Sequence, residues 1–370
     1  MGGDLLTLFL CGDVMLGRGV DQILPHPGDP ALREGYVRDA RAYIELAEAA
    51  NGPIPAPVDY SWPWGDALLV LDEAAPAARV LNLETSITGS AGFARDKEIH
   101  YRMHPANLPC LTAARPDVCV LANNHVLDFG RQGLTDTLDA LAGAGLRTAG
   151  AGADADAAGR PATVPLDGGR RILVFSLGMP SSGIPRSWAA TRDRAGVGFV
   201  ARPSSAAATV LADRVRQLKR PGDIALVSVH WGANWGYHVS RDEAAFAHAL
   251  LDGGVDVVHG HSSHHPRALE AYRGKLVIHG CGDFIDDYEG ITGYERYRDD
   301  LRLLCLVSLD PDTGALHEVR ITPLQARRMR LRHASQPDTR WLRAVLDRIS
   351  SGFRPCVTSA PEGTLTLRPA

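Results

Sequence analysis

The chain has 370 residues, of which 45% are hydrophobic and 22% charged, a composition typical of a globular protein with a large core. Its formal net charge of -4 gives no overall positive field, which argues against nucleic acid or an anionic membrane as a partner. The six cysteines include no close C-x-x-C pair, which favours reduced thiols and a cytoplasmic protein. No stretch has the length or flanking charges of a membrane span or signal peptide.

Short apolar runs alternate with segments of helical period along the chain, which is typical of βα units that build a helix-covered sheet. Taken in chain order, these runs predict strands at residues 5–10, 78–83, 117–122, 171–177, 223–229, 255–258 and 275–280. The helical period predicts helices at 36–50, 131–145, 204–220 and 241–254. The segments 301–309 and 315–324, joined by DPDTG, predict an antiparallel hairpin that completes the sheet.

The domain boundaries follow from the same pattern. One domain is expected over residues 1–325, because the predicted hairpin ends there. The proline-rich segment 21–66 is predicted to be an insertion over the site. Residues 326–370 are expected to form a C-terminal helix and a loose tail.

Five of the apolar runs stop at side chains that can bind metal ions. In open α/β sheets, the loops at the carboxyl ends of strands converge on one crevice, where ligands bind. Eight of the fourteen histidines lie between residues 230 and 279, and imidazole together with carboxylate suits zinc, manganese or iron. The side chains at the five ends are Asp13, then Glu84, then Asn123, Asn124 and His125, then His230, and finally His259, His261, His264 and His265.

Each group has a plainer explanation as well. Asp13 could be a turn or helix-cap carboxylate, and Asn124 with His125 could form a self-satisfied polar turn. Glu84 could cap a helix, although Asn82 points to the same side and also needs a polar partner. The histidines of 259–265 could be a surface cluster, but four in seven residues at a strand end favour metal binding, with His259 or His265 supporting the ligands.

With these motifs in order, the sequence resembles the CapA family of capsule and poly-γ-glutamate synthesis proteins, itself similar to calcineurin-like metallophosphoesterases. The resemblance covers roughly residues 5–290. It implies an α/β fold, a four-layer αββα sandwich with the metal site at the strand ends. The motifs are GDVMLGR (12–18), WGDAL (64–68), NLETS (82–86), YRMHP (101–105), LANNHVLDFG (121–130), HWG (230–232), GHSSHHP (260–266) and GDFIDDYEG (282–290).

The resemblance also implies roles for individual residues. His125 would protonate a leaving-group oxygen and would be oriented by Asp128. The chain departs from the phosphoesterase pattern at Met15, which stands where those enzymes have a histidine ligand, and in having G-H-x-x-H rather than G-H-x-H. The ligands of one or two divalent ions (manganese, zinc or iron) would be Asp13, Glu84, Asn124, His230, His261 and His264.

These features predict a metal-dependent hydrolase in which a metal-activated water attacks a phosphoester and His125 is the general acid. The substrate is expected to be a small or polymeric anion held by Arg18, Lys97 and Arg102. The aromatic residues expected to wall the pocket are Trp62, Trp64, Trp231 and Trp235.

Two alternatives to phosphoester hydrolysis stay open. The family's association with poly-γ-glutamate suggests hydrolysis or formation of a γ-glutamyl or related amide bond. The chain could also be a non-catalytic accessory protein of capsule or poly-γ-glutamate synthesis, with a structural metal or none. The sequence leaves the oligomeric state open.

Overall fold

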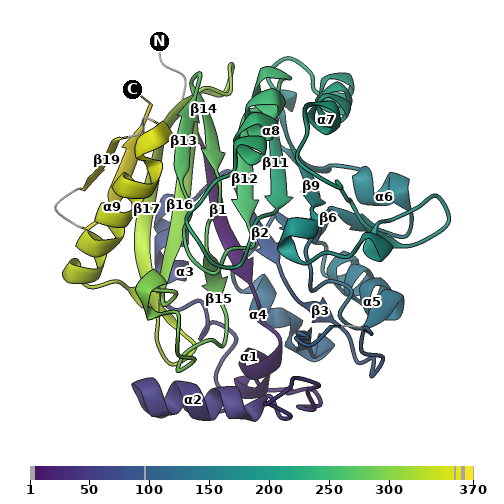
Figure 1. The fold of residues 1–370 in the computed structure, drawn as a ribbon, viewed down its shortest axis with the longest axis vertical. Coiled ribbons are helices and arrows are strands. Elements are labelled where there is room, and N and C mark those ends of the chain that lie inside the picture. Colours follow the sequence, from purple (N-terminus) through teal and green to yellow (C-terminus); the bar gives the residue numbers. More distant parts are fainter. Residues whose placement is uncertain (1–4, 96, 354–355, 360–362, 370) are drawn as a thin grey trace.

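Two β-sheets lie face to face in the computed structural model, which describes residues 5–95, 97–353, 356–359 and 363–369 (Figure 1). The larger sheet includes two short strands outside its main order: β15 (Asp283–Ile285) pairs with β1, and β18 (Leu331–His333) pairs with β17. The order across this sheet is β19 (Cys356–Ser359), β20 (Leu365–Arg368), β17 (Leu316–Ala326), β16 (Leu301–Leu309), β1 (Leu6–Val14), β2 (Ala78–Leu83), β5 (Val118–Val120) and β6 (Arg147–Ala149).

The smaller sheet contributes the second layer of strands. Two short pairs lie outside both sheets: β3 (Ser86–Ile87) with β4 (Arg102–Met103), and β7 (Ala151–Gly152) with β10 (Gly196–Val197). The order across the smaller sheet is β13 (Leu269–Tyr272), β14 (Lys275–Ile278), β12 (Val257–His261), β11 (Ile224–His230), β9 (Arg171–Gly178) and β8 (Ala162–Pro165).

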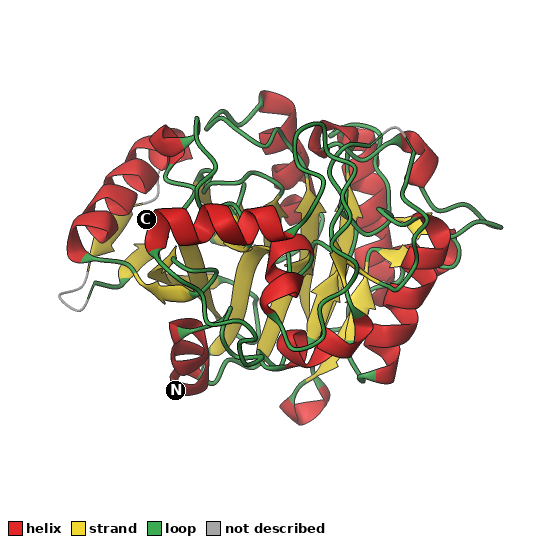
Figure 2. Ribbon diagram, turned by 90° about the horizontal axis from the view of Figure 1, so that it is seen from below, coloured by secondary structure: helices red, strands yellow, loops and turns green. Residues whose placement is uncertain are grey.

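Helices cover the outer face of each sheet (Figure 2). On the larger sheet, the outer core packs against α1 (Arg18–Ile23), α2 (Arg41–Asn51), α3 (Asp66–Ala74), α4 (Leu108–Thr112) and α5 (Gly130–Gly143). On the smaller sheet it packs against α7 (Ser205–Leu218) and α8 (Arg241–Asp252). The short helix α6 (Ala155–Gly159) follows β7, and α9 (Gln336–Ser350) packs near β13 and β19. The layer order is αββα, as predicted.

The alternation of side chains along β1 explains the layering. Phe9 points to the helices, whereas Leu8 and Leu10 point to the core between the sheets. Strand β11 is buried along its whole length, because one face meets the other sheet and the opposite face meets the helices. Apolar runs without alternation therefore marked strands buried on both faces.

The C-terminal segment differs from the loose tail that the sequence predicted. The predicted hairpin forms as β16 and β17, and helix α9 follows it. Beyond the helix, β20 pairs with β17 and β19 pairs with β20, so the larger sheet continues. Leu365 and Leu367 of β20 enter the core between the sheets, which is what holds these short strands.

The insertion 21–66 carries the predicted helix as α2. Helices α1 and α2 lie below the strand ends in Figure 1. Within the described part of the chain, no helix combines the length and the apolar character needed to cross a membrane.

We predict that Leu226→Ala lowers the free energy of unfolding by about 2–5 kcal/mol, because it leaves a cavity in the core between the sheets. The matched control is Leu69→Ala on α3, where the side chain is 64% exposed, with an expected change within about 0.5 kcal/mol. Urea unfolding of both variants measures the difference. Equal losses would contradict the assignment of Leu226 to the inter-sheet core.

Candidate metal centre

The carboxyl ends of β1, β2 and β5 bring the first predicted ligands to one edge of the larger sheet. These strands pair in parallel, and Asp13 is in register with Asn82. Asn82 Nδ2 donates to Asp13 Oδ1 at 2.7 Å and to Glu84 Oε2 at 2.8 Å. One amide group therefore holds both carboxylates, and Asn82 has the polar partners that the sequence required.

The register of β11 and β12 places two imidazoles side by side. His230 is paired with His261, and Ser228 with His259. Neighbouring strands are about 4.8 Å apart, so rings on paired residues touch. The Nδ1 atoms of His230 and His261 are 2.8 Å apart, and Ser228 Oγ lies 2.8 Å from His261 Nε2. Parallel pairing thus creates a pair of facing nitrogen ligands.

Hydrogen bonds between the sheets join these two edges. His230 Nε2 donates to Asn124 Oδ1 at 2.9 Å, and the backbone NH of Ser262 donates to Asp13 Oδ2 at 3.1 Å. Asp13, His230 and His261 each offer a ligand atom, and these atoms lie within 4.8 Å of one another. The structure therefore gathers carboxylate, amide and imidazole groups from both sheets.

His264 reaches the same region through a carboxylate that the sequence reasoning missed. Its Nδ1 lies 3.0 Å from Asp283 Oδ1, and Asp283 is in register with Asp13. The surface-cluster explanation for residues 259–265 is wrong, because all four histidines are buried. Asp283 follows the apolar run 275–280 within the GDF motif, so the strand-end rule used for the other ligands would have found it.

Burial disfavours the charged forms of Asp13 and Glu84, and the nearby His264 and Lys97 offset this effect only in part. Burial and the charge of Asp283 raise the pKa of Asp13 to about 7, and burial with the charge of Asp13 raises that of Glu84 well above its usual value. Among the described residues, their ion-pair contacts are imidazoles: His261 for Asp13, and His125 and His230 for Glu84.

Neutral imidazoles complete a donor set that fits a divalent transition metal. Burial lowers the pKa of His230 and His261 well below the usual value, so both rings are neutral. A neutral imidazole keeps one nitrogen lone pair with which it can bind a metal ion. Carboxylate oxygens with neutral imidazole nitrogens suit manganese, zinc or iron. A cation of charge two would also offset the buried negative charge at Asp13 and Glu84.

His125 lies beside this donor set with its other nitrogen held by Asp128. His125 Nδ1 lies 2.7 Å from Asp128 Oδ2 and 3.0 Å from Lys97 Nζ. Because a carboxylate only accepts hydrogen bonds, the shorter contact favours the ring proton on Nδ1. His125 Nε2 then faces Glu84 Oε1 at 3.8 Å. Lys97 donates to Asp128 and to the Asn124 carbonyl oxygen, so it lies at this site. His125 and Asp128 are arranged as the resemblance implies, and their catalytic roles remain predictions.

Arg18 and Arg102, the other two basic residues predicted to bind substrate, donate hydrogen bonds to groups of the protein itself. Arg18 is 4% exposed and donates to both carboxylate oxygens of Asp287, at 2.8 and 2.5 Å, and to Glu34 at 2.9 Å. Arg102 donates to the carbonyl oxygens of Ser90 and Asp29, both at 2.8 Å. Nothing in these contacts tests substrate binding, which stays a prediction for Arg18, Lys97 and Arg102.

The four tryptophans predicted to wall the pocket lie in different parts of the structure. Trp64 and Trp231 are fully buried in the two outer cores, so they do not line an open pocket. Trp62 donates to the carbonyl oxygen of Arg328, which lies in the link from β17 to β18. Trp235 lies against His264, with ring centroids 5.3 Å apart. Only Trp235 among the four therefore borders the metal-binding region.

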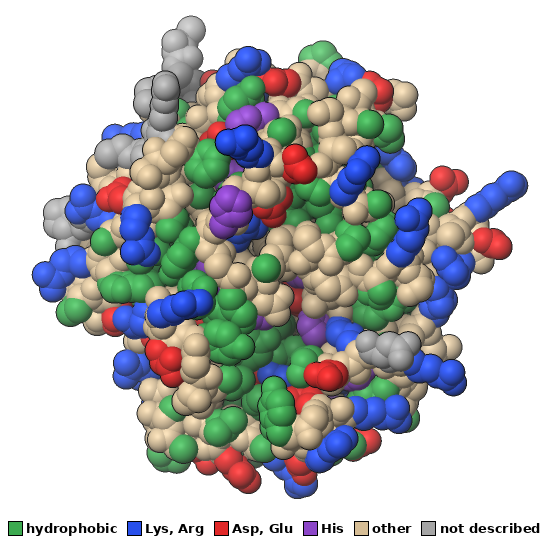
Figure 3. Space-filling model, viewed as in Figure 1, with side chains coloured by type: hydrophobic (Ala, Val, Ile, Leu, Met, Phe, Trp, Pro, Cys, Tyr) green, Lys and Arg blue, Asp and Glu red, His purple; other side chains and the backbone are tan. Residues whose placement is uncertain are grey.

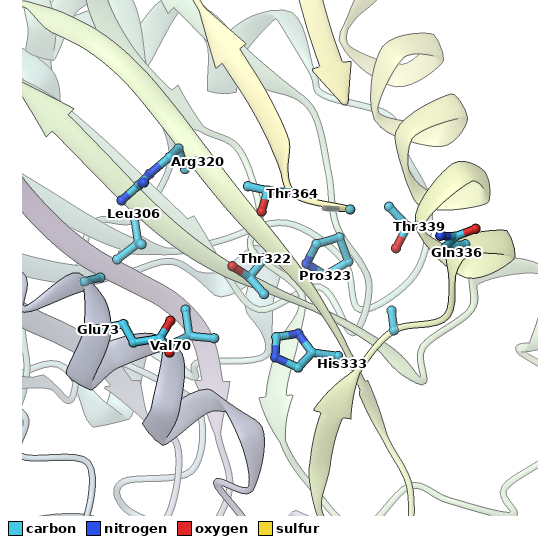
Figure 4. Close-up of a pocket in the computed structure, with 13 residues that line it drawn as sticks. Val70, Glu73, Leu306, Arg320, Thr322, Pro323, His333, Gln336, Thr339 and Thr364 are labelled. Atoms are coloured by element: carbon cyan, nitrogen blue, oxygen red, sulfur yellow. The ribbon is translucent and has the colours of Figure 1, made fainter. Parts of the chain in front are cut away.

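A hollow of about 420 Å³ is lined by Gly232, Trp235, His238 and Arg267 among others, and Trp235 connects it to His264 of the candidate centre. In the space-filling view, histidine and acidic side chains are visible in a recess below the middle of the molecule (Figure 3). A second pocket, of about 460 Å³, lies between α3, β17 and α9, and none of its lining residues belongs to the candidate centre (Figure 4).

We predict that manganese stabilises the metal-free protein, by about 2.7 kcal/mol at an ion concentration 100 times the Kd. His261→Ala should remove most of this gain, because it deletes one of the facing nitrogens, whereas His317→Ala, at an exposed position of β17, should keep it. Thermal unfolding and elemental analysis measure the effect. A wild-type protein that is not stabilised by manganese, zinc or iron would refute the centre.

Comparison with solved structures gives matches of low sequence identity, among them two proteins from Thermus thermophilus. A 5'-nucleotidase precursor is 15% identical with a TM-score of 0.48, and the match covers 93% of this chain and 59% of that one. The sulfate thiohydrolase SoxB is 14% identical with a TM-score of 0.47, and the match covers 95% and 62%. At TM-scores below 0.5, we base no inference on these two matches.

Sequence comparison gives stronger matches. Two probable polyglutamine synthesis accessory proteins of Mycobacterium tuberculosis are each 56% identical over 373 residues, covering 99% of this chain and 97% of the relative. The PGA biosynthesis protein CapA of Bacillus subtilis is 25% identical over 302 residues, covering 80% and 66%. Residues 7–288 match the family described as bacterial capsule synthesis protein PGA_cap. This match spans the motifs that resemble CapA, and the chain belongs to the PGA_cap family.

Proposed function

We propose that this chain is a metal-dependent hydrolase that cleaves a phosphoester. The observation that carries the proposal is the meeting of buried carboxylates and neutral imidazoles, next to a histidine held by its own carboxylate. Carboxylates and imidazoles alone would fit a structural ion. The addition of His125 and Asp128, which face the donor set without being needed to complete it, favours catalysis.

The residues that would hold one or two divalent ions are Asp13, Glu84, Asn124, His230, His261 and His264. A bound ion supplies Lewis acidity and lowers the pKa of a water molecule. The chain's own part is to hold these groups in place before substrate arrives. Asn82 fixes the two carboxylates, and the register of β11 and β12 fixes the two imidazoles.

His125 would control the proton. Burial, together with the positive charge of Lys97, lowers its pKa to about 4 although Asp128 opposes the shift, so His125 Nε2 is unprotonated near neutral pH in the free protein. An anionic group entering the site would raise this pKa, because negative charge favours the protonated ring. His125 would then carry a proton at Nε2 only with substrate present and would donate it to the leaving oxygen.

The phosphoester substrate is proposed as a small or polymeric anion. Its anionic group would supply the negative charge that His125 needs, and it would enter through the hollow bordered by Trp235. We place the protein in the cytoplasm, because the five cysteines whose side chains are described are free thiols.

We predict that the manganese-loaded protein hydrolyses an aryl phosphate, and that His125→Ala lowers kcat by about 10²–10⁴-fold through loss of proton transfer. His317→Ala should retain the wild-type rate. Phosphate release is followed spectroscopically, and elemental analysis confirms that His125→Ala still holds its metal. Equal rates in wild type and His125→Ala would sink the proposed role, and absence of any ester cleavage would sink the phosphoesterase.

A second candidate is an accessory role in polymer synthesis, favoured by the names of the relatives, which refer to polyglutamine synthesis and PGA biosynthesis. In this case the bond acted on would be a γ-glutamyl amide, or none. Release of glutamate from poly-γ-glutamate, with no phosphate from any ester, would identify the amide activity.

For the non-catalytic role, the decisive measurement is polymer yield in cells that depend on this chain. We predict that His125→Ala, if folded and metal-loaded, lowers the yield by the same factor as its loss of hydrolysis. An undiminished yield with His125→Ala would instead favour a non-catalytic accessory function.

A further inference from the structure

Asp283 is a buried carboxylate that lies beside the six predicted ligands and has no role among them. It is the first residue of β15 and is 1% exposed. In the parallel pairing of β1 with β15, it stands in register with Asp13. Paired residues of adjacent parallel strands point to the same face, so the two carboxylates lie next to each other.

The backbone imposes this closeness. Asp13 N donates to the carbonyl oxygen of Gly282 at 3.2 Å, and a Cβ added at Gly12 would lie 1.6 Å from that oxygen. Only glycine at position 12 allows the two strands to approach so closely. The close approach of β1 and β15 thus places the carboxylates of Asp13 and Asp283 side by side, although their like charges repel.

The two oxygens of Asp283 have different environments. Oδ1 lies 3.0 Å from His264 Nδ1, whereas Oδ2 is buried and has no hydrogen-bond partner among the described residues. The nearby basic group does not supply one, because Arg302 donates to Asp286 at 2.5 Å. Burial opposes the ionisation of Asp283, but the charges of His264 and Arg302 lower its pKa, and neither residue donates to Oδ2. A buried carboxylate oxygen with no hydrogen-bond partner is costly and is free to bind a cation.

We propose that Asp283 is a further metal ligand, which binds the ion through Oδ2 on the side where His264 lies. The inference rests on the metal centre of the proposed function but not on its phosphoester chemistry. The side chain two residues beyond Asp13, directly after β1, is the buried thioether of Met15, a softer group than manganese prefers. Asp283, from the adjacent strand, supplies a hard oxygen to that part of the site.

The competing explanation is that Asp283 only positions His264 and shares a proton with Asp286. The substitution Asp283→Asn separates these roles, because asparagine keeps one oxygen to accept from His264 but loses the charged second oxygen. Asp256→Asn is the matched control: that carboxylate is equally buried, is bound by Lys219 and Lys275, and none of its contacts involves the centre.

The experiment titrates the metal-free full chain with manganese and, separately, with cobalt as a spectroscopic probe. We expect Asp283→Asn to lose one ion, or to bind manganese more than about 100-fold more weakly, beyond the 10–100-fold typical of a supporting residue. The visible cobalt spectrum should change with the loss of a ligand. Asp256→Asn should match wild type in both, and urea unfolding of each metal-free variant checks that it is folded.

An Asp283→Asn variant with wild-type stoichiometry and affinity, or with weaker binding but an unchanged cobalt spectrum, would overturn the proposal and leave the proposed hydrolase intact. Conversely, a wild-type chain that binds metal through Asp283 but cleaves no ester would sink the phosphoesterase alone. A wild-type chain that binds no divalent ion would overturn both.

Discussion

Asp13 and Glu84 are buried carboxylates that share a single amide donor, Asn82, and among the described residues their charged-group contacts are neutral imidazoles. Burying charge without a counter-charge is among the most unfavourable arrangements in a protein interior. The chain nevertheless buries this pair at the place where both sheets meet. A site of this kind is stable only when a cation is bound or when protons replace it, as the raised pKa values of both carboxyls indicate.

The register of the strands determines where the donor atoms of the site lie. Parallel pairing sets His230 beside His261, and the crossing of β1 with β15 sets Asp13 beside Asp283. Each pair is fixed by backbone hydrogen bonds in strands that are buried on both faces, so the donor atoms need little rearrangement when an ion binds. Such preorganisation on rigid elements is what a catalytic metal site requires.

The basic residues near the site show how the chain limits its own positive charge. Arg18 lies between Asp287 and Glu34, and Lys97 holds the carboxylate that orients His125. Both cations therefore pair with carboxylates in the walls of the site, and Lys97 offsets the charge of Glu84 only in part. Binding of an anionic substrate would then depend on the bound metal more than on surface charge, which links substrate affinity to metal loading.

The sequence by itself determined the long buried strands, because a strand buried on both faces is an unbroken apolar run. It also located the polar residues that end these strands, because they are adjacent to them in the chain, whereas the αββα class came from the resemblance to a known family. Contacts between distant segments needed the tertiary structure. Arg18 and Asp287 are 269 residues apart, so no local pattern shows that they pair. The short strand at Asp283 and the hairpin after α9 form only because β1 and β17 offer edges to pair with, and those edges exist only in the folded sheet.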